Sequence, residues 1–366
     1  MKIIYTHEAL MKSKSRLSRF YYEIVSRMKH NVDGLHVCKL FATNTYFKSL
    51  IKRLPLPFTP DSARKSYIIE QLEHFNTYLN LRFRRYDLVH VTDDKSDALR
   101  WTKKPIVITI HDVIAEKYNI SDWRQRYAPR HELINNAAHV ICISETTRTD
   151  LLKIYDKVNP RNVSVIYPGC CSQCVSYENK YNFDYLLYVG SRRVEYKNFS
   201  RFIRAIAPIL SNSKLKLICT GSPFTDDELS LIKQYDLYNS VVNVGYISDD
   251  ALASLYHFAK IFVYPSKYEG FADQILEAYT NECPIAVSDI ACFHEIAGDA
   301  AAFFNPESEE SIRNCIQYVL STPTYAEELV KRGNERQKMF SWDVATQRTY
   351  EVYRHLVPAR KRPNRY

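Results

Sequence analysis

The sequence predicts an α/β protein built from two doubly wound, Rossmann-like domains. Two observations predict this class. Short apolar segments rich in β-branched residues alternate with segments of helical period, which is the pattern of right-handed βαβ units in a parallel sheet covered on both faces. The length of 366 residues exceeds that of one ordinary domain and favours two domains of about 150–200 residues.

The first domain is expected over residues 1–168. Its strands should be short, apolar and buried, and its helices should carry apolar residues on one face. The expected strands are Ile3–Tyr5, Leu35–Phe41, Asp87–Val91, Ile106–Ile110, Val140–Ile143 and Val163–Tyr167. The expected helices are Leu17–Met28, Ser62–Tyr78 and Glu145–Ile154.

The second domain is expected over residues 182–340, where the alternation is more regular. The expected strands are Asp184–Gly190, Leu215–Thr220, Ser240–Val244, 261–265 and 284–288. The expected helices are Lys197–Leu210, Asp226–Tyr235, Asp249–Phe258 and Ala272–Tyr279. Residues 169–181 have no periodicity and are interpreted as a linker, while residues 341–366 should hold a final helix and a basic tail.

The composition favours a globular protein without a membrane-spanning segment. Hydrophobic residues make up 46% of the chain, which is enough for two cores. No apolar run approaches the roughly 20 residues that a membrane-spanning helix needs, and the opening MKIIYTHEAL lacks the apolar stretch of a signal peptide. We therefore expect a cytoplasmic protein, a compartment that also suits nine cysteines as free thiols.

The positive charge is concentrated in the front half. Residues 1–166 hold 28 Lys and Arg against 17 Asp and Glu, a net charge of +11, whereas the remainder has a net charge of −2. A basic half favours an anionic partner. No helix-turn-helix, zinc-finger or RNP-like pattern is present, so an anionic membrane leaflet or a phosphate-bearing acceptor is favoured over nucleic acid.

Metal-binding patterns are incomplete. Cys170, Cys171 and Cys174 are not followed by a second pair at zinc-site spacing. Asp226 and Asp249 belong to aspartate pairs, but both open expected helices, where acidic residues are favoured by the helix dipole. We expect neither a metal nor a cofactor.

Glu269 and Glu277 form the most informative pair. Glu269 lies in the turn after the expected strand 261–265, and Glu277 is expected about two turns into the next helix. In open α/β sheets, ligands bind at the carboxyl ends of the strands. Two carboxylates at this edge can hold sugar and ribose hydroxyls, while the positive end of the helix can face a phosphate.

Basic and imidazole side chains follow other strand ends. Arg192 and Lys197 lie between the strand that ends at Gly190 and the next helix, where fixed positive charge can stabilise a phosphate leaving group. Arg193 is an ambiguous neighbour. His111 ends the strand Ile106–Ile110 and should lie at the carboxyl edge of the first sheet, although it could simply end that strand.

These motifs together resemble the family 4 glycosyltransferases, which have the GT-B fold. The segment EGFADQILEA, residues 269–278, is similar to the E-x7-E element of that family. Further similar segments follow in the order of the family: DLVHVTDD at 87–94, PIVITIHDVI at 105–114, HVICISETTRTDLLKIY at 139–155, VSVIYPG at 163–169, LLYVGSRRVEYKN at 186–198 and FSWDVATQRTYEVYRHL at 340–356.

The resemblance implies a fold and an activity. The two domains would face each other across a cleft, and the helix within 341–366 would cross back to the first, acceptor-binding domain. The chain would be a retaining, metal-independent hexosyltransferase of cell-surface polysaccharide synthesis. It would move a hexose from a GDP- or UDP-linked sugar to a hydroxyl of a glycan or lipid-linked acceptor, by front-side attack in which the leaving phosphate helps to take the acceptor proton.

The resemblance also assigns residues. His111 and Glu269 would lie beside the transferred sugar as the catalytic residues. Residues 182–340 would bind the nucleotide sugar, with the diphosphate on the basic loop and the ribose on the E-x7-E helix. The donor-binding residues would be Arg192, Lys197, Glu277, Gly270, Phe271 and Ala272.

The chain departs from the family pattern at two places. Ala272, Asp273 and Gln274 replace the second glycine, the leucine and the proline of the E-x7-E element. The front loop Ser15–Phe20 lacks the glycines that often precede the first helix, so Arg16 and Arg19 are expected to contact an anionic acceptor instead. Two alternative functions remain: a sugar-nucleotide epimerase of similar fold, and a non-catalytic partner subunit, which Ala272 and Asp273 suggest.

A further hypothesis concerns the inner face of the cell membrane. Segment 41–58, FATNTYFKSLIKRLPLPF, interleaves aromatic and basic residues as lipid-facing surfaces do. We expect salt-sensitive peripheral association through this segment, with an ordinary solvated basic face as the alternative. The residues expected at the lipid are Lys48, Lys52, Arg53, Phe47 and Phe58.

Overall fold

The chain forms two compact units. The computed structural model describes residues 1–11, 15–41, 46–49, 63–93, 96–118, 128–170 and 176–358. Unit 1 contains Met1–Gly169 and Ser341–Tyr366, and unit 2 contains Cys170–Phe340. The chain therefore leaves unit 1 once, completes unit 2, and returns to unit 1 with its last helix.

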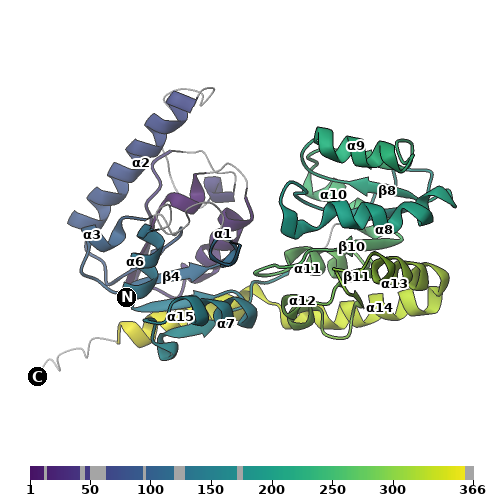
Figure 1. Ribbon diagram of the computed structural model, residues 1–366. Coiled ribbons are helices and arrows are strands. Elements are labelled where there is room, and N and C mark those ends of the chain that lie inside the picture. The colour runs from purple at the N-terminus through teal and green to yellow at the C-terminus, as the bar shows by residue number, and fades with distance from the viewer. Residues whose placement is uncertain are drawn as a thin grey trace, which may run out of the picture. The chain divides into compact units, whose positions relative to one another are not determined.

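Unit 1 is built on a six-stranded parallel sheet in the order β2-β1-β3-β4-β5-β6. Its strands are β1 (Lys2–Tyr5), β2 (Gly34–Val37), β3 (Leu88–Val91), β4 (Ile106–Ile110), β5 (His139–Cys142) and β6 (Val163–Val165). Its α-helices are α1 (Arg16–Met28), α2 (Ala63–Phe83), α3 (Ala98–Trp101), α4 (Ile114–Lys117), α6 (Ala128–Asn136), α7 (Glu145–Ile154) and α15 (Trp342–Leu356). Figure 1 shows helices flanking the sheet of each unit.

Unit 2 repeats this plan with the strand order β12-β11-β10-β7-β8-β9. Its strands are β7 (Tyr185–Tyr188), β8 (Lys216–Cys219), β9 (Val241–Asn243), β10 (Ile261–Tyr264), β11 (Ile285–Ser288) and β12 (Ala302–Phe304). Its α-helices are α8 (Phe199–Ser211), α9 (Asp226–Gln234), α10 (Asp249–Phe258), α11 (Asp273–Thr280), α12 (Ala291–Ala297), α13 (Glu309–Ser321) and α14 (Pro323–Arg336). The predicted α/β class with two doubly wound parallel sheets is confirmed.

The apolar pattern of the sequence explains both cores. All five residues of β4 and all four of β10 are buried, as expected of strands covered on both faces. The predicted apolar face of α8 is buried against the unit 2 sheet in full. Its members are Phe199, Phe202, Ile203, Ile206 and Ile209.

β7 and β10 are neighbours in the unit 2 sheet, with Leu186 opposite Ile261. From β7 the chain continues to β8 and β9 on one side, and from β10 it continues to β11 and β12 on the other. This reversal is the topological switch point of a doubly wound sheet, and ligands bind outside the carboxyl ends of the strands that meet there. The loops after β7 and β10 are therefore the first place to seek a site.

Several element boundaries differ from the expectations. β2 ends at Val37 instead of Phe41, because the backbone N–H groups of Leu40 and Phe41 donate to the carboxylate of Glu73, at 2.7 and 2.9 Å, and leave the sheet. α8 begins two residues later than expected. The elements that were not predicted are β12, α3, α4, α6, α12, α13 and α14.

The final helix α15 packs against α1 within unit 1. The hydroxyl groups of Tyr353 and Tyr5 lie 2.7 Å apart, and Arg27 Nε donates to Asp343 Oδ1 at 2.9 Å. At the start of α15, Trp342 closes over Gly169, where an added Cβ would lie 2.3 Å from the Trp342 nitrogen. Only glycine fits at this exit from unit 1.

The expected lipid-facing segment falls largely outside the described residues. This applies to Lys52, Arg53 and Phe58, and to the side chain of Lys48. Phe47 is described: it is fully buried, with its ring centroid 5.7 Å from that of Tyr22. The expectation that Phe47 contacts lipid is therefore wrong. None of the described helices combines the length and apolarity needed to cross a bilayer.

Candidate functional site

An ion pair joins the two loops at the switch point of unit 2. Lys197 ends the 3₁₀ turn Glu195–Lys197 after β7, and Glu269 lies in the loop after β10. Lys197 Nζ donates to Glu269 Oε1 at 2.6 Å, and the two side chains are 14% and 8% exposed. An ammonium and a carboxylate are therefore held together, largely shielded from water, at the sheet edge where the fold favours ligands.

Local backbone geometry fixes this pair. Asn198 adopts a left-handed conformation with φ of 59°, which ends the 3₁₀ turn and starts α8. Its side-chain amide donates to the carbonyls of Pro265 at 3.1 Å and Pro306 at 2.8 Å. The loop after β7 is thus bound to the end of β10, so Lys197 has little freedom to move.

Arg192 occupies a different position from Lys197. Its side chain is 2% exposed, and its Nε lies 3.2 Å from Glu228 Oε1. Nη1 donates to the Thr220 carbonyl at 2.8 Å, Nη2 donates to the Ser222 carbonyl, and the guanidinium stacks on Phe224 at 4.8 Å. Arg192 therefore clamps the loop after β7 to the loop after β8, and its charge is compensated inside the protein.

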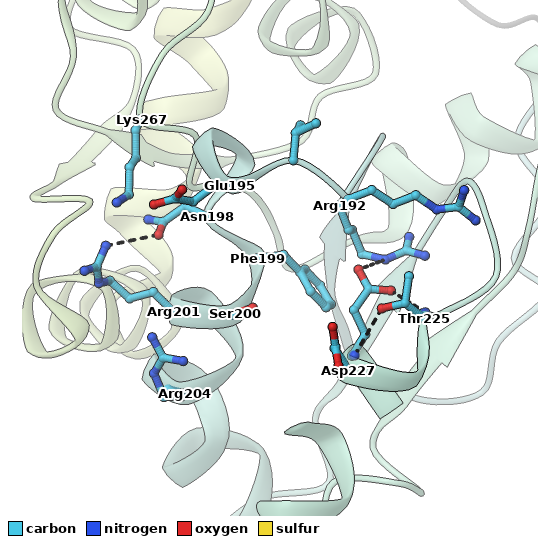
Figure 2. Close-up of a pocket in the computed structure, with 13 residues that line it drawn as sticks. Arg192, Glu195, Asn198, Phe199, Ser200, Arg201, Arg204, Thr225, Asp227 and Lys267 are labelled. Atoms are coloured by element: carbon cyan, nitrogen blue, oxygen red, sulfur yellow. Dashed lines mark hydrogen bonds and ion pairs between the residues drawn. The ribbon is translucent and has the colours of Figure 1, made fainter. Parts of the chain in front are cut away.

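Arg192 and Glu228 line a polar cavity of about 600 Å³ in unit 2 (Figure 2). Its lining residues are Arg192, Arg193, Val194, Glu195, Asn198, Phe199, Ser200, Arg201, Arg204, Thr225, Asp227, Glu228 and Lys267. Neither Lys197 nor Glu269 is among these described lining residues. This cavity therefore includes Arg192 but not the Lys197–Glu269 pair.

α11 begins at Asp273, so Glu277 lies about one turn into the helix. The expected position, about two turns into the helix, was therefore about one turn too far along it. Its Oε2 accepts a hydrogen bond from the Tyr256 hydroxyl at 3.0 Å. This bond orients a half-buried carboxylate on the helix that follows Glu269. The arrangement suits a carboxylate that accepts hydrogen bonds from ligand hydroxyls.

The first turn of α11 packs close to the end of β7. Gly270, Phe271 and Ala272 lead into the helix and are all buried, and Ala272 supplies no side-chain cap. Gly190 has φ of +110°, and a Cβ there would lie 3.5 Å from Gln274 Nε2. Glycine is favoured at position 190 by this backbone conformation, since a Cβ there would make only an ordinary contact. The N-terminal N–H groups of α11 favour an anion.

In unit 1, His111 follows β4 and lies against α1. Its ring meets the ring of Phe20 edge to face at 4.9 Å between centroids. α1 begins with a capping box between Ser15 and Ser18, which replaces the glycine turn absent from this loop. Arg16 is exposed in the first turn of α1, and Arg19 Nε lies 3.9 Å from Glu23. His111, Arg16 and Arg19 thus belong to one region of unit 1.

Several residues that hold these positions were not among the predicted site residues. Glu228 both caps α9 with Thr225 and pairs with Arg192; the signal was the capping box Thr-Asp-Asp-Glu. Tyr256, which orients Glu277, carried no local signal. In unit 1, Lys39 and Glu73 form a fully buried ion pair 2.9 Å long. Within the described ranges no cluster of three or more His, Cys, Asp or Glu suits a metal ion.

Comparison with known proteins matches both units to glycosyltransferase families. Residues 18–171 match the family model "Glycosyltransferase Family 4", and residues 176–336 match "Glycosyl transferases group 1". The two matches together span most of both units. Their boundary falls at the exit from unit 1.

Curated relatives carry related names. O-antigen chain mannosyltransferase B of Escherichia coli is 28% identical over 269 residues, which cover 68% of this chain and 70% of the relative. O-antigen chain mannosyltransferase RfbU of Salmonella typhimurium is 27% identical over 239 residues, which cover 64% of this chain and 65% of the relative.

Solved structures share the fold. Sucrose-phosphate synthase from Thermosynechococcus elongatus superposes with a TM-score of 0.72 at 18% identity, covering 97% of this chain and 99% of that one. Anabaena HepE in complex with UDP and glucose has a TM-score of 0.70 at 16% identity, covering 96% and 99%. The matching families and the two parallel sheets lead to one conclusion: the chain belongs to the family 4-like glycosyltransferases of the GT-B fold.

Proposed function

We propose that this glycosyltransferase moves a hexose from a nucleotide-diphosphate sugar to a hydroxyl of a glycan or lipid-linked acceptor in cell-surface polysaccharide synthesis. Mannose is the first candidate, because the two O-antigen relatives are named mannosyltransferases. The Lys197–Glu269 pair carries the proposal. A fixed ammonium suits a diphosphate, and the carboxylate beside it suits a sugar hydroxyl.

The proposed reaction retains the configuration of the sugar and uses no metal. The acceptor oxygen forms a bond to the anomeric carbon while the bond to the diphosphate breaks, and the bonding electron pair leaves with the nucleoside diphosphate. The acceptor proton passes to that leaving phosphate. Lys197 and the uncapped start of α11 stabilise the developing negative charge, and Glu277 accepts hydrogen bonds from the ribose. Glu269 and His111 act at the transferred sugar.

Arg192 takes a positioning role in this proposal. Its guanidinium is already paired with Glu228 and hydrogen-bonded to two carbonyls, so its positive charge is largely compensated within unit 2. By clamping the loop after β7, it keeps Lys197 in place. Arg16 and Arg19 are proposed to contact an anionic acceptor, such as a lipid-linked diphosphate, which would be met at the inner face of the cell membrane.

The test begins with thermal unfolding of the purified protein in the presence of nucleoside diphosphates, since a ligand that binds only the folded state stabilises it. Labelled GDP- and UDP-linked hexoses are then incubated with saccharide and lipid-linked acceptors, with and without a chelator. Transfer with retention that survives the chelator supports the proposal. An epimerised donor would indicate the epimerase alternative, and neither binding nor turnover would indicate a partner subunit.

A further inference from the structure

Helix α2 presents an apolar stripe to solvent. Ile68, Leu72, Phe75, Leu79 and Phe83 recur at steps of four, three, four and four residues, so they lie along one side of the helix. Phe75 is 56% exposed and Phe83 is 72% exposed, and the other three are also exposed. Single exposed apolar residues are ordinary, but a continuous stripe along a 21-residue helix marks an interaction surface.

The opposite side of α2 anchors the helix to unit 1. Ile69, Glu73, Thr77 and Leu81 are buried there. Glu73 is paired with Lys39 at 2.9 Å, and Thr77 Oγ1 lies 2.8 Å from a ring nitrogen of His7. The helix therefore folds onto unit 1 through its other side, and the stripe is left over after folding. Figure 1 shows α2 as the long helix at the edge of unit 1.

Among the described side chains of α2, the charges beside the stripe are positive. The acidic residues of α2 are Glu70 and Glu73, which lie about 200° and 140° around the helix from Ile68 and so belong to the other side. Arg82 borders the stripe, and Arg84 and Arg85 follow it; all three are exposed.

A second basic segment lies near the same end of α2. The hydroxyl groups of Tyr86 and Thr102 lie 2.6 Å apart, which brings the exposed Lys103 and Lys104 close to the arginines. Asp97, the acidic residue of this segment, is 3.2 Å from Arg100 and 3.4 Å from His74. The carboxyl end of the stripe is therefore strongly basic.

We propose that α2 docks unit 1 onto an anionic lipid surface. The aromatic and aliphatic side chains of the stripe insert at the boundary between headgroups and acyl chains, and the arginines bind lipid phosphates. A lipid surface fits a stripe that runs about 22 Å along the helix axis from Ile68 to Phe83, and the basic end complements anionic headgroups. The choice of a lipid rests on the proposed function, which places the enzyme where lipid-linked acceptors lie.

Vesicle co-sedimentation tests this surface with the full chain. Vesicles of phosphatidylcholine alone are compared with vesicles that also contain phosphatidylglycerol, at low and high salt. Wild type should bind the anionic vesicles, and binding should fall with salt. Leu72→Ser/Phe75→Ser/Leu79→Ser should abolish binding. Arg82→Gln/Arg84→Gln/Arg85→Gln should weaken it about a hundredfold, at roughly 1 kcal/mol per basic residue.

The controls change exposed residues of unit 2. Tyr238→Ser/Tyr318→Ser removes two exposed aromatic rings, and Lys214→Gln/Lys233→Gln/Lys331→Gln removes three exposed charges. Both should bind as wild type does, and every variant should unfold at the wild-type temperature. Equal binding to neutral and anionic vesicles, or undiminished binding of the serine variant, would overturn the proposal. The proposal would also be overturned if wild type were a dimer in solution and the serine variant a monomer. A second copy of the chain, and not a lipid surface, would then cover the stripe.

The same variants separate this proposal from the proposed function. Transfer to a water-soluble acceptor should be unchanged in the serine variant, because the stripe has no part in the chemistry. Lipid binding through α2 without any sugar transfer would refute the proposed function alone. Sugar transfer without lipid binding would refute the docking surface alone.

Discussion

The ammonium of Lys197 and the carboxylate of Glu269 lie 2.6 Å apart although 72 residues separate them in the chain. Each side chain neutralises the other in the protein as described. A diphosphate that approaches Lys197 would compete with Glu269 for the same ammonium, which would release the carboxylate toward a sugar hydroxyl. The pair can therefore couple arrival of the donor to positioning of the sugar.

Replacing Glu269 by alanine should affect turnover much more than nucleotide binding. We expect turnover to fall about a hundredfold, the range for removal of one preorganised electrostatic group. Affinity for the bare nucleoside diphosphate should hold or rise, because Lys197 would lose its internal partner. Steady-state kinetics and calorimetric titration measure the two quantities. Parallel losses in both would identify Glu269 as a structural residue.

Replacing Lys197 by alanine should weaken binding of a nucleoside diphosphate by about 1.5–3 kcal/mol, as for hydrogen bonds to charged groups. The bare nucleoside carries no phosphate, so its affinity should stay close to that of wild type. Calorimetric titration with both ligands is the measurement. Lys260→Ala, which removes an exposed lysine 3.2 Å from Asp184 at the opposite end of β10, is the matched control and should leave both affinities unchanged. If nucleoside and diphosphate lose affinity equally, Lys197 does not act on the phosphates.

Replacing Glu277 by glutamine should weaken nucleotide binding by about 1–3 kcal/mol, because the charged acceptor for the ribose is lost. Tyr256→Phe removes only the hydroxyl that donates to Glu277 at 3.0 Å, so a smaller loss of the same kind is expected. Comparing ribonucleotides with their deoxyribose counterparts isolates the sugar contact. Wild-type affinity of Glu277→Gln for every nucleotide that wild type binds would exclude this role.

Arg192→Ala should lower the stability of unit 2 by about 3–5 kcal/mol, because Glu228 would be left as an uncompensated buried charge. The double variant Arg192→Met/Glu228→Gln should recover most of this loss. Glutamine can still cap α9 with Thr225, and no charge remains buried. Urea unfolding followed by circular dichroism gives the midpoints. A double variant as unstable as Arg192→Ala would show that the pairing is not what stabilises the loop.

The sequence predicts most of the fold because local signals agree with the packing. α7 and α10 begin where expected, after Ser144 and Ser248, whose side chains cap them. α2 was predicted to end at Tyr78 but continues to Phe83, because apolar residues on both its sides hide the helical period. Because apolar residues occur on both sides of α2, the sequence pattern also did not reveal the exposed stripe.

The site was harder to predict than the fold. That Lys197 meets Glu269 depends on which strands are neighbours, and that Arg192 turns toward Glu228 depends on a residue from a third loop. Neither contact has a signal in the nearby sequence. Strand-end motifs therefore identify the residues of the sheet edge, while the pairing of their charges is decided by topology.

His90 should make the protein sensitive to mild acid. Its ring is 1% exposed, stacks on Tyr5, bonds Thr109 Oγ1 at 2.9 Å and contacts the Tyr353 hydroxyl. Burial, with a smaller contribution from the charge of His111, lowers the pKa of His90 from 6.5 to about 3. The unfolded chain takes up a proton below about pH 6.5, whereas the folded chain does not until about pH 3.

The stability that neutral His90 contributes is therefore complete above pH 6.5 and is lost as the pH falls toward 3, by roughly 1 kcal/mol per pH unit. His90→Gln cannot titrate, so its urea midpoint should change less than that of wild type between pH 7 and pH 5. His30→Gln, at an exposed position on the same unit, should keep the wild-type dependence. If His90 stays neutral in the folded protein, protonation of the unfolded chain must lower the free energy of unfolding as the pH falls. Identical pH profiles for His90→Gln and wild type would therefore mean that other groups set the acid sensitivity.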